Sequence, residues 1–233
     1  MKRRSFLVAA AGFGMLGTSA WAAPTRKIGN RDVFVVVDVQ NCFTPGGSLA
    51  VKEGDVIVPL INRIAKQFKH VVITQDWHTA DHISFASQHA GRKPFEMVKL
   101  AYGNQVLWPD HCVQGTEGAA LHKDLIIPHA ELIIRKGYRR EVDSYSAFLE
   151  ADKKTQTGLG GYLKQRGLKR AYFAGLATDF CVGWSALDAR KQGFEALVIE
   201  DACRGIDMQG SLAKAWAAMK VAGVKRIQST DVI

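Results

Sequence analysis

Four side chains that could take part in covalent chemistry lie at the ends of successive strand-like segments. They are Asp38, Asp76, Lys136 and Cys181. In an open parallel α/β sheet the carboxyl ends of the strands share one edge, so residues that are far apart in the chain can meet there in one pocket. A thiol beside a carboxylate and an ammonium group can act as an activated nucleophile. The pattern therefore predicts a cysteine hydrolase.

Cys181 follows the segment Gly175-Leu176-Ala177-Thr178-Asp179-Phe180 and begins an expected helix. The positive end of a helix favours the thiolate, which is the nucleophilic form of cysteine. Free backbone N–H groups in that first turn, those of Ala177 and Cys181, could also bind a developing oxyanion. On residue type alone a buried structural cysteine would be favoured. The position at a strand-to-helix turn favours a nucleophile instead.

Asp38 and Lys136 each end an apolar strand-like segment. An ionised carboxylate in such a place is costly unless it has a partner or a chemical role. Beside a thiol, the carboxylate could carry a proton to a leaving group while the cation stabilises the charged states. The alternative is a buried ion pair that only orients the sheet edge. The presence of all three groups favours the catalytic interpretation.

A carboxylate and several imidazoles form a second candidate cluster. Asp76 and His78 alternate in an extended segment and can therefore face the same way, His82 follows four residues after His78, and His111 lies further along the chain. One carboxylate with two or three imidazoles suits a divalent metal such as zinc, iron or manganese. Surface histidines in a loop are equally compatible with the spacing.

Two aromatic residues, Phe43 and Trp108, each lie within a few residues of a candidate site group. A flat aromatic substrate could stack between their rings. The alternative is that each ring only packs in the core, which is the commoner fate of a large aromatic side chain.

Apolar, β-branched runs alternate with amphipathic stretches along the chain. This rhythm predicts strands over residues 33–38, 70–75, 131–135, 169–175, 195–200 and 225–229, and helices over residues 56–68, 160–165, 178–191 and 211–221. Near-continuous apolar strands are typical of a parallel sheet covered on both faces. We therefore expect a doubly wound α/β fold with a six-stranded, mainly parallel sheet. In the common strand order, Asp38 and Cys181 become neighbours.

The first 22 residues have the features of an export signal. A basic start at residues 2–4 precedes a short apolar run, and the small residues at 20 and 22 are typical of a cleavage site after Ala22. The paired arginines followed by Phe-Leu indicate the twin-arginine route. A membrane anchor is disfavoured because the apolar run is short for a bilayer span of about 20 residues. We expect an exported, periplasmic protein with one domain over residues 23–233.

The charge pattern disfavours nucleic-acid binding. The formal net charge is +9, but the basic residues are scattered among acidic ones and form no stripe with aromatics. A dinucleotide site is also disfavoured, because residues 39–41 read Val-Gln-Asn where a Gly-rich turn would be needed. After the signal we expect no membrane association, and a homo-oligomer is compatible with the sequence.

The cysteines disfavour a zinc ribbon and a thioredoxin-type site, since none of them form a Cys-x-x-Cys pair. They are Cys42, Cys112, Cys181 and Cys203. An even number in an exported chain permits disulfides, although a domain of this size does not need them to hold its core.

Seven short motifs follow one another along the chain. They are Asp38-Val39-Gln40-Asn41, Gln75-Asp76-Trp77-His78, Ser84-Phe85-Ala86-Ser87-Gln88-His89, Trp108-Pro109-Asp110-His111-Cys112-Val113-Gln114, Lys136-Gly137, Asp143-Ser144-Tyr145-Ser146-Ala147-Phe148 and Gly175-Leu176-Ala177-Thr178-Asp179-Phe180-Cys181-Val182. Together they resemble the nicotinamidase/pyrazinamidase family of isochorismatase-like cysteine hydrolases. The resemblance covers essentially the whole chain after the signal. It implies hydrolysis of nicotinamide to nicotinate and ammonia in NAD salvage, with pyrazinamide as a further candidate substrate.

The resemblance also implies a catalytic triad. Cys181 matches the nucleophile, Asp38 matches the proton-transferring carboxylate and Lys136 matches the third member. The oxyanion hole of the family falls on the backbone N–H groups of Ala177 and Cys181. A cis peptide bond is expected between Leu176 and Ala177.

The metal ligands and the aromatic walls of the family match further positions. Asp76, His78 and His111 match its ligands for one divalent metal ion, and His82 matches a fourth ligand that only some members use. Phe43 and Trp108 match the walls around the pyridine ring.

Two departures from the family pattern stand out. Cys42 occupies a position where the family usually has Asp, which puts a second thiol beside the pocket and could permit inhibition by oxidation. Most relatives are cytoplasmic, whereas this chain begins with an apparent export signal. Scavenging of nicotinamide outside the cytoplasm is the role that this combination suggests.

Two other functions compete with this one. A cysteine hydrolase on the same fold could act on another small amide, a carbamoyl compound or a vinyl ether, but such relatives generally lack the Asp-x-His metal set. A non-catalytic protein that only binds a metal or ligand would lack the nucleophile or the base. All three triad residues are present, which disfavours it.

Overall fold

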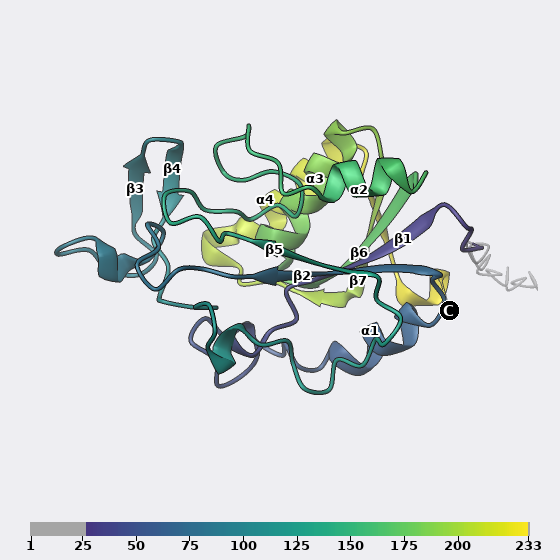
Figure 1. Ribbon diagram of the computed structural model, residues 1–233, viewed down its shortest axis with the longest axis horizontal. Helices are drawn as coiled ribbons and strands as arrows, with labels where there is room; N and C mark the ends of the chain where they lie inside the picture. Colours follow the sequence, from purple (N-terminus) through teal and green to yellow (C-terminus); the bar gives the residue numbers. More distant parts are fainter. Residues whose placement is uncertain (1–26, 233) are drawn as a thin grey trace, which may run out of the picture.

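The computed structural model describes residues 27–232, so the expected export signal over residues 1–22 lies outside the described residues. The central sheet has six strands in the order β5-β2-β1-β6-β7-β8 (Figure 1). In chain order these strands are β1 (Asp32–Val37), β2 (His70–Asp76), β5 (Leu132–Lys136), β6 (Arg170–Leu176), β7 (Glu195–Arg204) and β8 (Lys225–Ile227). All neighbouring pairs are parallel. The predicted doubly wound fold is therefore confirmed, with β1 beside β6.

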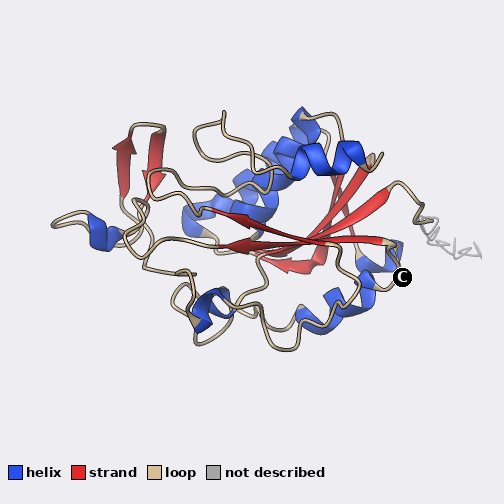
Figure 2. Ribbon diagram, in the orientation of Figure 1, coloured by secondary structure: helices blue, strands red, loops and turns tan. Residues whose placement is uncertain are grey.

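Four α-helices cover the sheet from both sides. They are α1 (Val58–Ala65), α2 (Leu159–Gln165), α3 (Gly183–Lys191) and α4 (Ser211–Val221). Figure 2 shows α1 on one side of the sheet and the other three on the opposite side. Among residues 27–232, none of the helices has the length and apolar character needed to cross a membrane.

The middle of the sheet forms the core. Every residue of β1 and β2 is buried, as are six of the seven residues of β6. Because both faces of these strands are covered, the sequence reads as continuous apolar runs instead of an alternation. A polar side chain at the end of such a strand is thus placed in a dry environment at the sheet edge.

The expected single helix over residues 178–191 is divided in the structure. A π-helical turn, Thr178–Val182, precedes α3, and the N–H of Val182 donates to the carbonyl oxygen of Ala177 at 3.1 Å. A wider turn of this kind often marks a functional site. Cys181 therefore lies within the π-helical turn and not at the start of α3, which corrects the expectation from the sequence.

A two-stranded antiparallel hairpin was not predicted. It consists of β3 (Met97–Leu100) and β4 (Gly103–Val106) and stands apart from the central sheet (Figure 1). Its residues are mostly exposed or half-buried, so the sequence contains no apolar run at this point. Beyond β4 the chain enters the segment that holds Trp108.

Candidate active site

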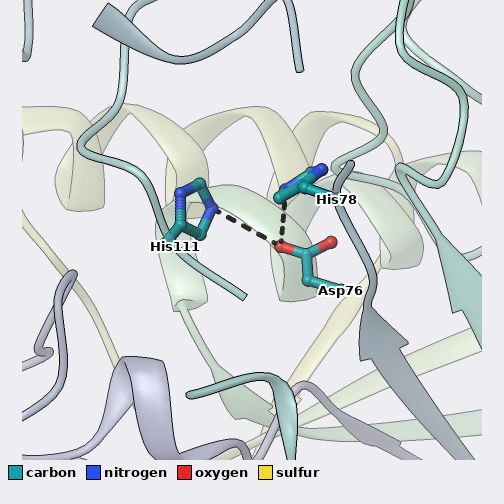
Figure 3. Close-up of side chains that lie close together, drawn as sticks. All are labelled: Asp76, His78 and His111. Carbon is teal, nitrogen blue, oxygen red and sulfur yellow. Dashed lines mark ion pairs between the residues drawn. The ribbon is translucent and has the colours of Figure 1, made fainter. Parts of the chain in front are cut away.

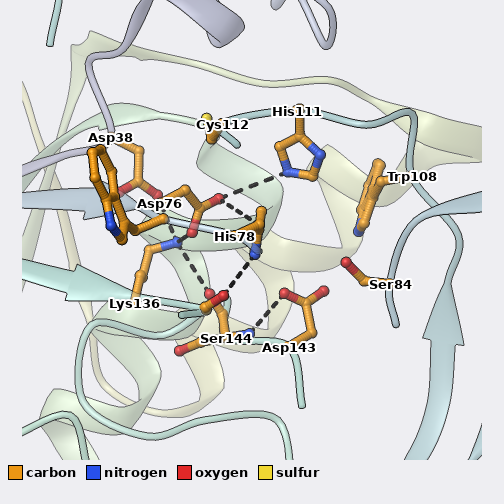
Figure 4. A network of polar contacts seen from close by, with 12 residues as sticks. Asp38, Asp76, His78, Ser84, Trp108, His111, Cys112, Lys136, Asp143 and Ser144 are labelled. Carbon is orange, nitrogen blue, oxygen red and sulfur yellow. Dashed lines mark hydrogen bonds and ion pairs between the residues drawn. The ribbon is translucent and has the colours of Figure 1, made fainter. Parts of the chain in front are cut away.

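The parallel register brings three of the reactive side chains together. Asp38 directly follows β1, while Asp76 and Lys136 are the last residues of β2 and β5 and are register partners. Asp38 and Lys136 are fully buried, and Cys181 is only 5% exposed. The strand ends thus place two carboxylates and one ammonium group together at one edge of the sheet (Figure 4).

Lys136 lies at the centre of this group. Its Nζ is 2.8 Å from Oδ2 of Asp38 and 3.3 Å from Sγ of Cys181, and it forms an ion pair with Oδ1 of Asp76. It also donates a hydrogen bond to the carbonyl oxygen of Ser144 at 3.1 Å. The predicted triad is therefore assembled around one cation, in contact with the predicted metal ligand.

Asp38 is oriented by its own backbone and by the neighbouring strand. Its φ of 48° lies in the left-handed region, which few non-glycine residues adopt. The Asp38 N–H donates to Oγ1 of Thr74 at 3.1 Å, and the Thr74 hydroxyl donates to Oδ1 of Asp38 at 2.5 Å. Thr74, on β2, is a supporting residue that the sequence did not reveal, because a threonine in a strand gives no chemical signal.

Burial and neighbouring charges set the protonation states of the triad. Burial raises the pKa of Asp38, although the Lys136 ammonium opposes this effect. Burial alone would lower the pKa of Lys136, but Asp38 and Asp76 outweigh it and raise that pKa well above its usual value. Lys136 therefore remains charged in the closed site.

The pKa of the Cys181 thiol is raised well above its usual value, because burial outweighs the opposing effect of Lys136. Asp38 and Asp76 raise it further. Burial therefore opposes the thiolate that the helix end was expected to favour. A thiol whose pKa is raised needs a base before it can attack, and Asp38 is the neighbouring carboxylate that could accept its proton.

Asp76, His78 and His111 form a cluster of possible metal ligands (Figure 3). Oδ2 of Asp76 lies 3.6 Å from Nε2 of His78 and 3.9 Å from Nε2 of His111. The Nδ1 atom of His78 contacts the carbonyl oxygen of Gly137 at 2.9 Å, and that of His111 contacts the carbonyl oxygen of Pro109 at 2.8 Å. Backbone carbonyls thus orient both rings so that Nε2 faces Asp76, as in many metal sites.

The charges of this cluster also fit a metal cation. Burial alone would lower the pKa of His78, but Asp76 outweighs it and raises that pKa, which shows that the cluster attracts positive charge. Burial and His78 lower the pKa of His111 to about 4, so its imidazole is neutral and can donate a lone pair.

Gly137 leaves the space that the ring of His78 needs. Its φ is +64°, and a Cβ atom built on it would clash with Cε1 and Nδ1 of His78. A side chain at residue 137 would therefore displace a possible metal ligand. The motif Lys136-Gly137 thus combines a residue of the predicted triad with a residue that must lack a side chain.

His82 is buried beside this cluster but does not join it. Its ring centroid is 4.3 Å from that of His78. Its Nδ1 lies 2.7 Å from Oγ of Ser84 and its Nε2 lies 3.3 Å from the carbonyl oxygen of Val142. The possible ligand group that includes His82 also contains His78 and Asp143, but neither Asp76 nor His111. Direct ligation by His82 stays a prediction.

A cavity beside Cys181 is lined by aromatic rings. Phe43 and Trp108, the predicted walls, both line it, together with Ala177 and Asp76. The sequence analysis assigned no role to several further lining residues, which are Leu49, Asp143, Tyr145, Phe180 and Ile206. The cis peptide bond expected between Leu176 and Ala177 is present at this wall.

The hairpin supports one wall of the cavity. Gln105 of β4 is 1% exposed, and its Nε2 donates to Oη of Tyr145 at 2.9 Å and to Oδ2 of Asp143 at 2.7 Å. Nε1 of Trp108 also donates to Oη of Tyr145 at 2.9 Å. Tyr145 lies in a motif quoted above, so that motif was its signal, whereas nothing in the sequence distinguished Gln105 from a surface glutamine.

Cys42 and Cys112 form a disulfide, while Cys181 and Cys203 are free. The expectation of a free thiol at Cys42 is therefore wrong. The even number of cysteines permitted a disulfide, but spacing could not show which residues pair.

Known proteins resemble this chain along most of its length. A family model described as an isochorismatase domain matches residues 32–231. The chain is 57% identical over 207 residues to a nicotinamidase from Acinetobacter baylyi, covering 89% of this chain and 97% of the relative. It is 42% identical over 194 residues to a nicotinamidase from Escherichia coli, covering 81% of this chain and 91% of the relative.

Solved structures give the same result. A nicotinamidase/pyrazinamidase from Acinetobacter baumanii superposes with a TM-score of 0.87 at 61% identity, covering 88% of this chain and 99% of that one. A pyrazinamidase from Pyrococcus horikoshii in complex with zinc superposes with a TM-score of 0.69 at 36% identity, covering 85% of this chain and 99% of that one.

Proposed function

Because the chain belongs to the isochorismatase family and its relatives include nicotinamidases, we propose that it is a nicotinamidase whose nucleophile is Cys181. The observation that carries the assignment is the position of Lys136, which contacts both Asp38 and Cys181, while Cys181 lines the aromatic cavity. The reaction converts nicotinamide and water to nicotinate and ammonia.

The first step forms a thioester. Asp38 takes the thiol proton of Cys181 as the sulfur attacks the carboxamide carbon, and Lys136 stabilises the negative charge that gathers on both groups. The amide oxygen becomes an oxyanion, for which the backbone N–H groups of Ala177 and Cys181 are the proposed donors. Asp38 then gives the proton to the amide nitrogen, the C–N bond breaks and ammonia leaves.

The second step releases the acid. Asp38 accepts a proton from a water molecule as the water oxygen attacks the thioester carbon. The C–S bond breaks, the proton returns to the sulfur of Cys181 and nicotinate leaves. Nicotinic acid and ammonia together contain every atom of nicotinamide and water, nicotinic acid loses its carboxyl proton to give nicotinate, and the enzyme returns to its starting state.

The cavity walls suit the pyridine ring of the substrate. Phe43 and Trp108 lie on the cavity surface with Cys181, so a flat ring between them presents its carboxamide to the sulfur. Holding the two reacting atoms in contact makes the attack nearly unimolecular. Pyrazinamide has a ring of the same shape and is a second proposed substrate.

Asp76, His78 and His111 are the proposed ligands of a divalent metal ion. Their oxygen and nitrogen donors suit zinc, iron or manganese. A metal bound there would supply a Lewis acid that anchors the ring nitrogen of the substrate, directly or through a bound water. The zinc in the pyrazinamidase relative supports a metal, while the identity of the ion in this chain is left to experiment.

We also propose that the enzyme acts outside the cytoplasm, on the basis of the signal-like features of residues 1–22. Fractionation of the native host, with immunodetection of the protein, tests this. Recovery of the protein in the periplasmic fraction is expected. Recovery in the cytoplasmic fraction alone would show that the proposal is wrong.

An ammonia-release assay tests the activity itself. The protein is incubated with nicotinamide in the presence of zinc, iron(II) or manganese, and Cys181→Ala is compared with Cys203→Ser, which changes a buried cysteine outside the cavity. We expect no turnover by Cys181→Ala and near-normal turnover by Cys203→Ser. Ammonia release by Cys181→Ala, or none by the unmodified protein with any of the three metals, would refute the assignment.

A further inference from the structure

The Cys42–Cys112 disulfide joins two segments that each carry a site residue. Cys42 directly precedes Phe43, a wall of the cavity, and Cys112 directly follows His111, a possible metal ligand. The ring centroids of Phe43 and His111 are 5.5 Å apart. The disulfide therefore links the backbone segment that carries Phe43 to the segment that carries His111.

Cys112 also holds the second imidazole. Its carbonyl oxygen accepts a hydrogen bond from the N–H of His78 at 3.0 Å, and the carbonyl oxygen of His78 accepts one from the N–H of Gln114 at 2.8 Å. The segment around Cys112 thus runs beside His78 as a short ladder. Two of the three possible metal ligands depend on the position of this one segment.

Neither end of the bridge lies in the central sheet. Cys42 belongs to a single short turn, Asn41–Phe43, and Cys112 has a φ of 45°, in the left-handed region. Segments outside the sheet open locally more readily than core strands do. A covalent link between two such segments, 70 residues apart in the chain, limits both local opening and the freedom of the unfolded state.

The bridge is enclosed, since Cys42 is 1% exposed and Cys112 is 2% exposed. Enclosure slows the attack of a solvent reductant on the disulfide, so the bridge persists once formed. We propose that the Cys42–Cys112 disulfide is a positioning bridge that holds His111 and Phe43 in place, so that metal affinity and substrate binding depend on its oxidation. The substrate part rests on the proposed function, whereas the metal part does not.

The main experiment measures zinc affinity by competition with a chromophoric chelator. The variant that carries both Cys42→Ser and Cys112→Ser is compared with the unmodified protein and with Cys203→Ser, which removes a buried thiol elsewhere. Measurements are made where each protein is folded by near-ultraviolet circular dichroism. We expect zinc binding to be weakened about tenfold or more in the double variant, in line with the loss caused by disturbing groups that orient metal ligands. Equal affinity in the double variant and Cys203→Ser would overturn the proposal.

The substrate readout separates positioning from general stability. With saturating metal, the double variant is expected to show a raised KM for nicotinamide while kcat changes less, because Phe43 shifts but the triad does not. A fall in kcat alone, with KM unchanged, would contradict this part of the proposal.

Hydrogen exchange provides a second test that needs no variant. The disulfide of the unmodified protein is reduced with a phosphine, which is oxidised to its phosphine oxide with an oxygen from water while the S–S bond is replaced by two S–H bonds. Amide exchange is then followed in peptides that cover residues 38–46 and 108–116. Exchange in both segments is expected to be faster after reduction, and unchanged exchange would overturn the proposal.

Failure of the bridge proposal and failure of the nicotinamidase assignment give different experimental results. Zinc affinity and amide exchange are measured without turnover. A protein that binds zinc more tightly with the disulfide intact, but releases no ammonia from nicotinamide, would refute the nicotinamidase assignment. The same result would still support the positioning role of the disulfide.

Discussion

Asp76 and Lys136 are register partners on β2 and β5, and their side chains form an ion pair at the edge of the sheet. Oδ1 of Asp76 contacts the ammonium group, while Oδ2 faces the two imidazoles. One carboxylate therefore joins the triad to the metal cluster. A change on either side of Asp76 is expected to affect both the chemistry and the binding of a metal.

Removal of the central cation is expected to be severe. Lys136→Met leaves the buried carboxylates of Asp38 and Asp76 without their shared partner, so the free energy of unfolding is expected to fall by about 3–5 kcal/mol. Turnover should fall below detection. Urea denaturation and ammonia release measure the two effects. Lys123→Met is the matched control because the Lys123 side chain is 84% exposed, and its stability should change by less than about 0.5 kcal/mol. A stable, active Lys136→Met protein would contradict the role given to the cation.

Removal of the Tyr145 hydroxyl is expected to disturb the cavity wall. In Tyr145→Phe the indole N–H of Trp108 loses its acceptor, whereas the Gln105 amide still donates to Asp143, and a buried unsatisfied donor costs about 1–3 kcal/mol. Thermal unfolding measures the loss, and KM for nicotinamide is expected to rise. Tyr138→Phe is the control, since Tyr138 is 41% exposed. Equal effects of the two changes would show that the Tyr145 network does not support the wall.

Stability in alkali should depend on Cys203. Burial raises the pKa of this thiol from 9.0 to about 12, so the folded protein holds the proton more tightly than the unfolded chain. The contribution of the neutral thiol is complete below pH 9 and is lost as the pH rises toward 12. The free energy of unfolding of the unmodified protein should therefore fall more steeply between pH 9 and 11 than that of Cys203→Ser. Parallel curves for the two proteins would contradict the raised pKa.

Thiol counting checks the cysteine pairing. After unfolding without reductant, two thiols should react with an alkylating reagent, namely those of Cys181 and Cys203. After reduction all four cysteines should react. Mass spectrometry of peptides then identifies which residues carry the label. Label on Cys42 or Cys112 before reduction would show that the disulfide is absent from the purified protein.

Removal of a proposed metal ligand should lower activity without unfolding the chain. His111→Ala is expected to weaken zinc binding at least about tenfold and to lower kcat/KM by a similar or larger factor, because it deletes one of three donors. His122→Ala is the control, because His122 lies in a loop outside the ligand groups. Metal content of the purified proteins and ammonia release are measured together. Normal zinc content in His111→Ala would show that His111 is not a ligand.

The strand ends were predictable because the apolar periodicity is local and the parallel register follows from it. Asp38, Asp76 and Lys136 end up together since each ends a strand of the same sheet. Three features could not be predicted in this way. The contact of Gln105 with Tyr145, the pairing of Cys42 with Cys112 and the high pKa of Cys181 all depend on how distant segments pack and exclude water. Such properties arise only in the folded chain.

Because glycine has no side chain, residue 137 is sensitive to any substitution. Its carbonyl oxygen orients His78, and the space beside its Cα is filled by the same ring. A replacement there would therefore move the ring of His78 away from Asp76 and His111, so Gly137→Ala is expected to weaken metal binding although it changes none of the proposed ligands or reacting groups.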